Sequence, residues 1–371
     1  MPNVTKRLIA YLLCGAALLG GGLGAAAPAS ARSHLHIVRP GQSIQQAVDA
    51  AAAGDTVLVL PGLYRESVTI EKPGVTLRGS GPSTVIQPAA TATASAAAQP
   101  AAGATRAAPL TCAESGSGVC VIGAKDKDLT GVTVAHLTVT GFARAGVFAM
   151  ATDGLTVRNV TAVRNSVWGI AVERSKHTVI RHNTLRSNGD AGVFLANTVK
   201  SEDGAVDAGG TLVERNRADG NRIGLTVRRL RNLTVDGNTL TGNCVGLFVV
   251  GDENTPKTGA LTVRDNQVVA NNKSCPATGR LPALQGSGIV LTGTEKVLVT
   301  GNHVRANAGT SVMSGGIVLF KSFVGATSTD NRITDNHLSD NAPADLVDTE
   351  TAGTNTYQGN TCRASRPAGM C

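Results

Sequence analysis

The feature that most constrains the fold is a repeat of paired asparagines in the second half of the chain. In each copy the two asparagines stand five positions apart, and most copies continue into a glycine followed by aliphatic residues. The shortest interval between copies is 22 residues, from Asn216 to Asn238, and the longer intervals carry insertions. The copies begin at Asn183, Asn216, Asn238, Asn266, Asn302 and Asn331.

This repeat predicts stacked short strands. Alternating Val, Ile and Leu side chains give each turn an apolar side, which it can bury only by stacking on its neighbours. We expect asparagine to take left-handed backbone at one corner and to hydrogen-bond to its equivalent in the next turn. The glycine is expected to make a second tight corner. Aromatic residues form only 3% of the chain, and the Leu-x-x-Leu-x-Leu frame of leucine-rich repeats is absent.

The chain before the repeats predicts a cap over the open end of the stack. A capping box at residues 43–46 opens a helical pattern that ends near Gly54. We therefore expect an N-terminal cap at about 36–54. Residues 88–110 are rich in Ala, Thr and Pro and predict a flexible insertion. Strands are expected at 56–60, 67–70 and 75–77.

The first 31 residues have the pattern of a cleavable export signal. Lys6 and Arg7 precede a largely apolar stretch, and Ala29-Ser-Ala31 is a small-x-small cleavage pattern. A membrane anchor is disfavoured because three glycines interrupt the apolar stretch. A lipoprotein that uses Cys14 is disfavoured because Leu13 stands where a small residue is expected. We predict a secreted, extracellular protein comprising residues 32–371.

Cysteine usage agrees with export. Removal of the signal leaves an even number of cysteines, which predicts disulfides in an oxidising compartment. Six cysteines allow 15 connectivities, and their local clustering makes neighbouring pairs the most economical choice. A zinc site is the alternative, but short Cys-x-x-Cys spacing is absent. The expected pairs are Cys112 with Cys120, Cys244 with Cys275, and Cys362 with Cys371.

The charge balance is basic. The chain carries 34 Lys and Arg against 26 Asp and Glu. The predicted signal holds only Lys6 and Arg7, which leaves 32 basic against 26 acidic residues and a net charge of +6. A basic exported protein tends to meet acidic partners such as uronate polysaccharides, teichoic polymers or extracellular DNA. A charge that serves only solubility is the alternative.

Four segments carry a family resemblance. Residues 36–48, 53–57, 61–64 and 75–79 resemble the opening of pectin-lyase-like right-handed β-helix proteins. The turns over 159–341 are similar to the parallel β-helix repeats of that superfamily, including its NosD-type group. The resemblance implies an all-β, single-stranded right-handed parallel β-helix, a solenoid with a short N-terminal capping helix. It also implies clear repeats at about 132–341 and a disulfide-closed tail at 342–371.

The resemblance is less specific for activity, because the superfamily includes lyases, hydrolases, epimerases and non-catalytic proteins. The motifs Asn-Thr-Asp, Asp-Asp and Gly-His-Gly of galacturonase-like enzymes are absent, as is the Asp-Pro-His-Asp of alginate epimerases. The nearest match to the Arg-x-Pro-x-x-Arg of pectate lyases begins at Arg280 and has Gln285 in place of the final arginine.

A groove is expected at the corner that follows the Gly-Ile/Val/Leu strands. Several loops there are longer than a corner needs, and long loops on a rigid scaffold often carry function. Arg228 or Lys321 could approach the C5 proton of a uronate, and Asp203 and Asp207 are further catalytic candidates. Calcium could neutralise the substrate carboxylate. Tolerated insertion and solvated charge are the alternatives. The candidate calcium ligands are Glu202, Asp203 and Asp207.

A column of phenylalanines is expected on one strand face. If Val147, Val193 and Leu247 point into the core, the residues after them must point outward on the same sheet. Such rings could stack on sugars as a substrate-binding surface. Cover by an overlying loop, 88–110 or 196–210, is the alternative. The three residues are Phe148, Phe194 and Phe248.

The sequence therefore predicts a secreted, monomeric β-helix that binds or processes an extracellular, acidic polysaccharide, with polysaccharide lyase or glycoside hydrolase chemistry as its enzymatic form. A non-catalytic envelope scaffold or NosD-like accessory protein is the alternative. Nucleic-acid motifs and a membrane span in the mature chain are not expected. Calcium is the one cofactor considered.

Overall fold

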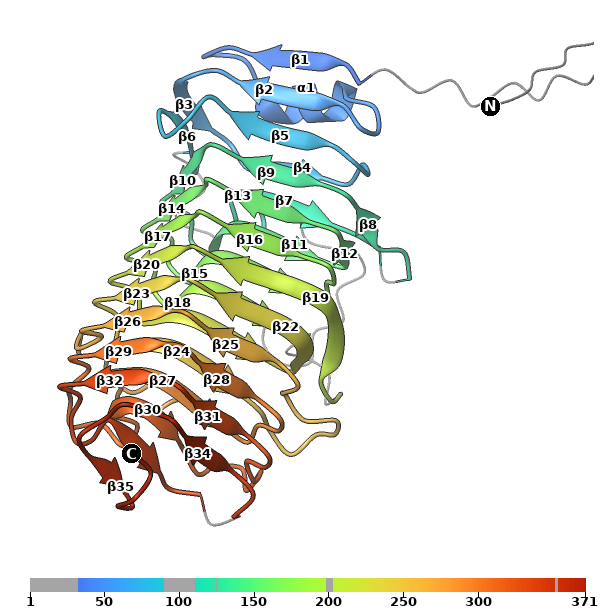
Figure 1. Ribbon diagram of the computed structural model, residues 1–371. Coiled ribbons are helices and arrows are strands. Elements are labelled where there is room, and N and C mark those ends of the chain that lie inside the picture. The colour runs from blue at the N-terminus through green and yellow to red at the C-terminus, as the bar shows by residue number, and fades with distance from the viewer. Residues whose placement is uncertain (1–32, 90–110, 125, 198–202, 351–352) are drawn as a thin grey trace, which may run out of the picture. The chain divides into compact units, whose positions relative to one another are not determined.

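A computed structural model describes residues 33–89, 111–124, 126–197, 203–350 and 353–371. The predicted export signal and most of the predicted insertion lie outside the described residues. Between them, the described segments form a parallel β-helix built from three long sheets, here named A, B and C (Figure 1). The fold class is therefore as the sequence predicts. Among the described residues no helix is both long and apolar enough to cross a membrane.

Each turn of the coil contributes a strand to sheet A, then to sheet B, then to sheet C. We name the connections between them the A–B, B–C and C–A corners. The strands of sheet A are β1 (Leu35–Val38), β2 (Thr56–Val59), β5 (Thr76–Gly79), β9 (Thr133–Ala135), β13 (Thr156–Arg158), β16 (Val179–Arg181), β19 (Val206–Glu214), β22 (Leu230–Asp236), β25 (Thr262–Arg264), β28 (Leu298–Thr300), β31 (Arg332–Thr334) and β34 (Thr356–Gln358).

Sheets B and C follow the same order. The strands of sheet B are β3 (Gly62–Arg65), β6 (Thr84–Gln87), β10 (Thr138–Thr140), β14 (Thr161–Val163), β17 (Thr184–Arg186), β20 (Arg217–Asp219), β23 (Thr239–Thr241), β26 (Gln267–Val269), β29 (His303–Arg305) and β32 (His337–Ser339). The strands of sheet C are β4 (Val68–Ile70), β7 (Val119–Ile122), β11 (Ala145–Met150), β15 (Trp168–Glu173), β18 (Ala191–Ala196), β21 (Ile223–Arg228), β24 (Val245–Val250), β27 (Ser287–Thr292), β30 (Gly315–Leu319), β33 (Leu346–Asp348) and β35 (Ser365–Arg366). Two short strands, β8 (Leu129–Thr130) and β12 (Thr152–Asp153), pair at the C–A corner.

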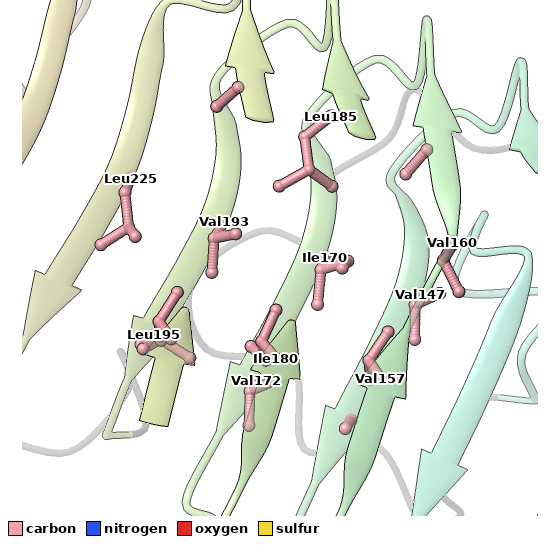
Figure 2. Packing of buried hydrophobic residues seen from close by; sticks show 14 of the residues in the cluster. Val147, Val157, Val160, Ile170, Val172, Ile180, Leu185, Val193, Leu195 and Leu225 are labelled. Carbon is pink, nitrogen blue, oxygen red and sulfur yellow. The ribbon is translucent and has the colours of Figure 1, made fainter. Parts of the chain in front are cut away.

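The core lies inside the coil. Equivalent residues of successive turns pair in register, as Val157 does with Ile180 and Ile170 with Val193. Their side chains pack between the sheets and are almost fully excluded from solvent (Figure 2). Burial of each such aliphatic side chain contributes about 1.5–3 kcal/mol relative to exposure, which explains why small aliphatic residues suffice.

Two ladders of buried asparagine run along the coil, one at the A–B corner and one at the B–C corner. Up to the last member of each ladder, the side-chain amide donates to the carbonyl oxygen of the equivalent asparagine in the next turn, at 2.9–3.1 Å. It also donates to a main-chain carbonyl of the preceding turn, as Asn221 does to Leu185. The predicted ladder is confirmed. Its members are Asn183, Asn216, Asn238, Asn266, Asn302, Asn336 and Asn360, and Asn165, Asn188, Asn221, Asn243, Asn271, Asn307 and Asn341.

The predicted backbone role of these asparagines is wrong. The left-handed conformation belongs to the residue before each ladder asparagine, for example His182 at φ 54° and Ser187 at φ 53°. Asparagine itself is selected for its amide, which can donate and accept at once inside the wall. The corner residue can therefore vary in type, whereas the ladder residue does not.

The predicted role of the glycines also needs correction. The glycine near the start of each long sheet C strand has no positive φ. A Cβ at Gly224 would lie 2.4 Å from the carbonyl oxygen of Gly246 and 3.1 Å from the amide nitrogen of Asn243. These glycines are required because neighbouring turns approach closely beside the B–C ladder.

The N-terminal cap forms as predicted, with an addition. Helix α1 (Ile44–Ala50) begins at Ser43, whose hydroxyl accepts from the backbone of Gln46 at 3.2 Å. The carboxylate of Glu66, from the following turn, accepts from the backbone of Ile44 and Gln45 at 2.8 and 3.1 Å. This contact ties the helix to the coil. Figure 1 shows α1 beside β2, at the end of the coil where β1 lies.

All three expected disulfides are present. Their Cα–Cα separations are 5.6 Å for Cys112–Cys120, 6.1 Å for Cys244–Cys275 and 5.3 Å for Cys362–Cys371. The second disulfide joins the start of β24 to the loop between β26 and β27, and the third closes the C-terminal tail. The local pairing inferred from sequence clustering is confirmed.

We predict that Asn221→Ala lowers the free energy of unfolding by about 2–4 kcal/mol, because it leaves the donors of Asn188 without their acceptor inside the wall. Urea unfolding followed by circular dichroism measures the change. The control is Gln267→Ala, an exposed position on the same coil, where we expect a change within about 0.5 kcal/mol. Equal losses in the two variants would contradict a structural role for the ladder.

Candidate functional site

The C–A corner, where the sequence predicts a groove, carries paired charges. The Nε of Arg229 lies 2.6 Å from Oδ2 of Asp252, and Nη2 of Arg228 lies 3.5 Å from the same oxygen. Arg231 pairs with Glu295 in the same strip. Burial acts to raise the pKa of Asp252, but the hydrogen bond and charge of Arg229 outweigh it and hold the pKa below its usual value.

The candidate catalytic residues do not form one cluster. Arg228 ends β21 and meets Asp252, which follows β24. Lys321 follows β30, which is three strands from β21 in sheet C. Asp207 lies in β19 at a register shift against β22, and its carboxylate accepts from the backbone of Gly209 at 2.7 Å and from Asn232 at 2.9 Å. These two hydrogen bonds lower the pKa of Asp207. Their placement favours a structural role for Asp207.

The candidate calcium ligands are only partly described. Glu202 lies outside the described residues, and Asp203 is exposed. Within the described segments, no group of three or more His, Cys, Asp or Glu side chains is arranged to hold a metal ion. Calcium binding therefore stays a prediction that rests on the sequence.

The phenylalanine column lies where the sequence places it. Val147, Val193 and Leu247 belong to the interior core, whereas their neighbours belong to a separate apolar cluster on the outer side of sheet C. These neighbours are largely buried: Phe148 is 7% exposed, Phe194 8% and Phe248 2%. This burial favours the covered-face alternative, and sugar stacking on these rings stays a prediction.

Part of the cover comes from a loop that the sequence did not single out. The loop between β26 and β27 contributes Cys275 and Leu284 to the outer cluster, and the disulfide to Cys244 holds it there. Arg222 donates from its guanidinium to the carbonyl oxygens of Pro276 and Pro282 in this loop. The long insertion in this repeat therefore serves to cover sheet C.

An aromatic stack beside the column was missed by sequence reasoning. The rings of Trp168 and Phe194 are stacked with centroids 4.8 Å apart. The guanidinium carbon of Arg144 lies 5.3 Å from the centroid of Trp168 and 5.1 Å from that of Phe148. The indole N–H donates to Asp190, whose pKa is raised by burial. Trp168 is partly exposed, so solvent reaches this stack.

Two open grooves lie elsewhere, on surfaces for which the sequence predicted no site. One groove of about 370 Å³ lies on the outer side of sheet B, where the rings of His303 and His337 stack with centroids 5.0 Å apart. Arg305 and Gln267 also line it. The alternation of inward and outward residues along β26, β29 and β32 could have placed these side chains on one surface.

The second groove lies at the A–B corner near the N-terminal end. Its volume is also about 370 Å³, and it is lined by Arg78, His136, Leu58, Gly79 and Ser80. Nη1 of Arg158 lies 2.9 Å from Nε2 of His136. Burial, and then the charges of the neighbouring arginines, lower the pKa of His136. A neutral imidazole accepts from Arg158, and the positive charge at this groove comes from arginine.

We predict that Asp252→Asn lowers the free energy of unfolding by about 1.5–3 kcal/mol, because it removes the charge that Arg229 contacts in a site of low exposure. Denaturant unfolding at neutral pH measures the change. The matched control is Asp236→Asn, whose partner Arg264 is largely exposed, and here we expect less than about 1 kcal/mol.

The same pair gives a pH dependence. Because the pKa of Asp252 is lower in the folded protein than in the unfolded chain, its stabilising effect is present above about pH 4 and is lost as the pH falls through the folded value. The stability difference between wild type and Asp252→Asn should therefore shrink on acidification. A difference that grows below pH 4 would contradict the pairing.

The fold is shared with proteins of known structure. The A-module of the Azotobacter vinelandii mannuronan C-5 epimerase AlgE6 is 19% identical, with 85% of this chain and 88% of that chain covered and a TM-score of 0.60. An alginate lyase from Paenibacillus sp. strain FPU-7 is 13% identical, with 88% and 99% covered and a TM-score of 0.54. DFA-IIIase from Arthrobacter chlorophenolicus A6 is 13% identical, with 87% and 84% covered and a TM-score of 0.56.

Sequence comparison points to the same architecture. No curated protein matches the chain by sequence. The family described as right handed beta helix region matches residues 110–202 and 197–323, which is more than half of the chain. The matched region contains most of both asparagine ladders. The chain therefore belongs to the right-handed β-helix family.

Proposed function

We propose that this protein is exported and binds an acidic polysaccharide outside the cytoplasm. The observation that carries the proposal is a set of arginines without an ion pair. In the described part of the chain, Arg78, Arg158, Arg181, Arg215 and Arg217 form no ion pair with a carboxylate. An array of guanidinium groups favours a partner that carries regularly spaced anions, because arginine binds carboxylate through two parallel hydrogen bonds.

Three disulfides support a location outside the reducing cytoplasm. The names of two similar structures state action on mannuronan and on alginate, which are polymers of uronic acids. Their identity to this chain is low, so they support the class of ligand and not a reaction. Binding without chemistry is the form of the function that the geometry supports best, because the outer face of sheet C is apolar and largely covered.

We expect the mature protein to bind polyuronate and not a neutral polysaccharide of the same length. Binding should weaken as salt is raised, because exposed ionic contacts are screened. Isothermal titration or affinity electrophoresis at low and at physiological ionic strength measures this. Equal binding to neutral and acidic polymers, or binding to neither, would contradict the proposal.

A lyase is the second candidate, favoured by Arg228. Its guanidinium is partly exposed beside Asp252 and could neutralise a substrate carboxylate. Lyase cleavage leaves an unsaturated uronide that absorbs ultraviolet light. We expect no rise in absorbance when the protein is incubated with polyuronates. A rise that disappears in Arg228→Gln would establish the lyase and overturn the non-catalytic form of the proposal.

A further inference from the structure

The outer side of sheet B carries an unusual column of side chains. One outward position, the first residue of each strand, is in register over eight successive strands from β10 to β32. None of these residues is a carboxylate. Figure 1 shows the strands stacked one after another along one side of the coil. The column comprises Thr138, Thr161, Thr184, Arg217, Thr239, Gln267, His303 and His337.

Arginines flank the N-terminal half of this column across the A–B corner. Arg158 and Arg181 are paired neighbours at the ends of β13 and β16. On the next turn, Arg215 directly precedes the ladder residue Asn216. The side chains of Arg215 and Arg217 are both exposed. The Nε of Arg181 is buried with no hydrogen-bond partner. These cations stand on successive turns, and within the described segments none of them forms an ion pair, although Glu214 is the register neighbour of Arg181 in the next turn.

The two open grooves lie at opposite ends of the same strip. The groove of Arg78 and His136 adjoins Arg158 at the N-terminal end. The groove of His303 and His337 lies at the C-terminal end of the column. We name these arginines, the eight-residue column and the two grooves together the sheet B track.

We propose that the sheet B track binds the acidic polysaccharide, with the polymer lying along the coil axis and one sugar residue to each turn. The inference rests on the proposed function and names the surface that performs it. Adjacent parallel strands lie about 4.8 Å apart, close to the length of one uronate residue in an extended chain. Carboxylates repeating along the polymer would meet Arg158, Arg181 and Arg217, which lie on three successive turns.

The uncharged members of the track favour a polysaccharide over a nucleic acid. Threonine hydroxyls and the Gln267 amide offer both donors and acceptors, which suit sugar hydroxyl groups between the carboxylates. Nucleic-acid surfaces instead combine a denser set of phosphate contacts with aromatic side chains that stack on bases. The part of the track that the structure describes holds histidine rings and no Phe, Tyr or Trp.

The test compares two triple variants of the full mature protein. In the track variant, Arg181, Arg215 and Arg217 are each changed to Gln. In the control, the same change is made at three exposed arginines away from the track, so that both proteins lose the same charge. We expect the track variant to bind polyuronate at least about tenfold more weakly than wild type and the control to bind within about threefold. The control positions are Arg39, Arg332 and Arg366.

Oligomer length supplies a second readout. Eight strands span about 34 Å along the coil, so affinity for oligouronates should rise up to about eight residues and then level off. Equal weakening of the track and control variants, or a plateau already at two or three residues, would overturn the assignment while leaving polyuronate binding intact. Tighter binding to single-stranded or duplex DNA that the track variant alone loses would also overturn it.

Absence of polyuronate binding in the wild type would instead overturn the proposed function itself. Thermal unfolding of all three proteins serves as the check on folding. We expect the three transition temperatures to agree, because the substituted side chains are exposed at all three control positions and at Arg215 and Arg217, and Arg181 is half-buried without a hydrogen-bond partner at its Nε. If the track variant is destabilised, the single Arg217→Gln variant, at an exposed position, carries the comparison.

Discussion

The structure depends on the side-chain hydrogen bonds between equivalent asparagines of successive turns. At two of the three corners, each amide gives one hydrogen bond forward along the coil and one back to the main chain, so its polar atoms are satisfied inside the wall. A buried amide without hydrogen-bond partners would destabilise the fold by more free energy than one ladder hydrogen bond contributes. Any turn that shifted by one residue would lose both ladders at once, and the turns are therefore locked in register.

Register in turn determines what the surface can do. Because every strand repeats the same alternation, outward residues form columns along the coil, as in sheet B, where Thr184, Arg217 and Thr239 are direct neighbours. The C–A corner lacks this order because its loops differ in length, and there the acids and bases pair with each other. Ion pairs also lie on the regular sheets, as between Arg186 and Asp219 in sheet B, but the column that begins each sheet B strand from β10 to β32 carries no carboxylate.

Sequence reasoning captured the coil, the ladder, the three disulfides and the outward direction of Phe148, Phe194 and Phe248, since these follow from period and local spacing. It misplaced the left-handed residue by one position and misread the reason for the glycines, because both depend on contacts between turns. The grooves at His136 and His303 were missed because their walls come from residues more than 30 positions apart or from separate strands. The pairing of Arg229 with Asp252 was missed as well, because it depends on the three-dimensional course of the loops at the C–A corner.

The most direct measurement is a crystal structure of the mature protein with an oligouronate of about eight residues bound. The account places the sugar chain parallel to the coil axis on the outer side of sheet B, with carboxylates at Arg181 and Arg217. A sugar chain seated on the outer face of sheet C or along the loops of the C–A corner would contradict it.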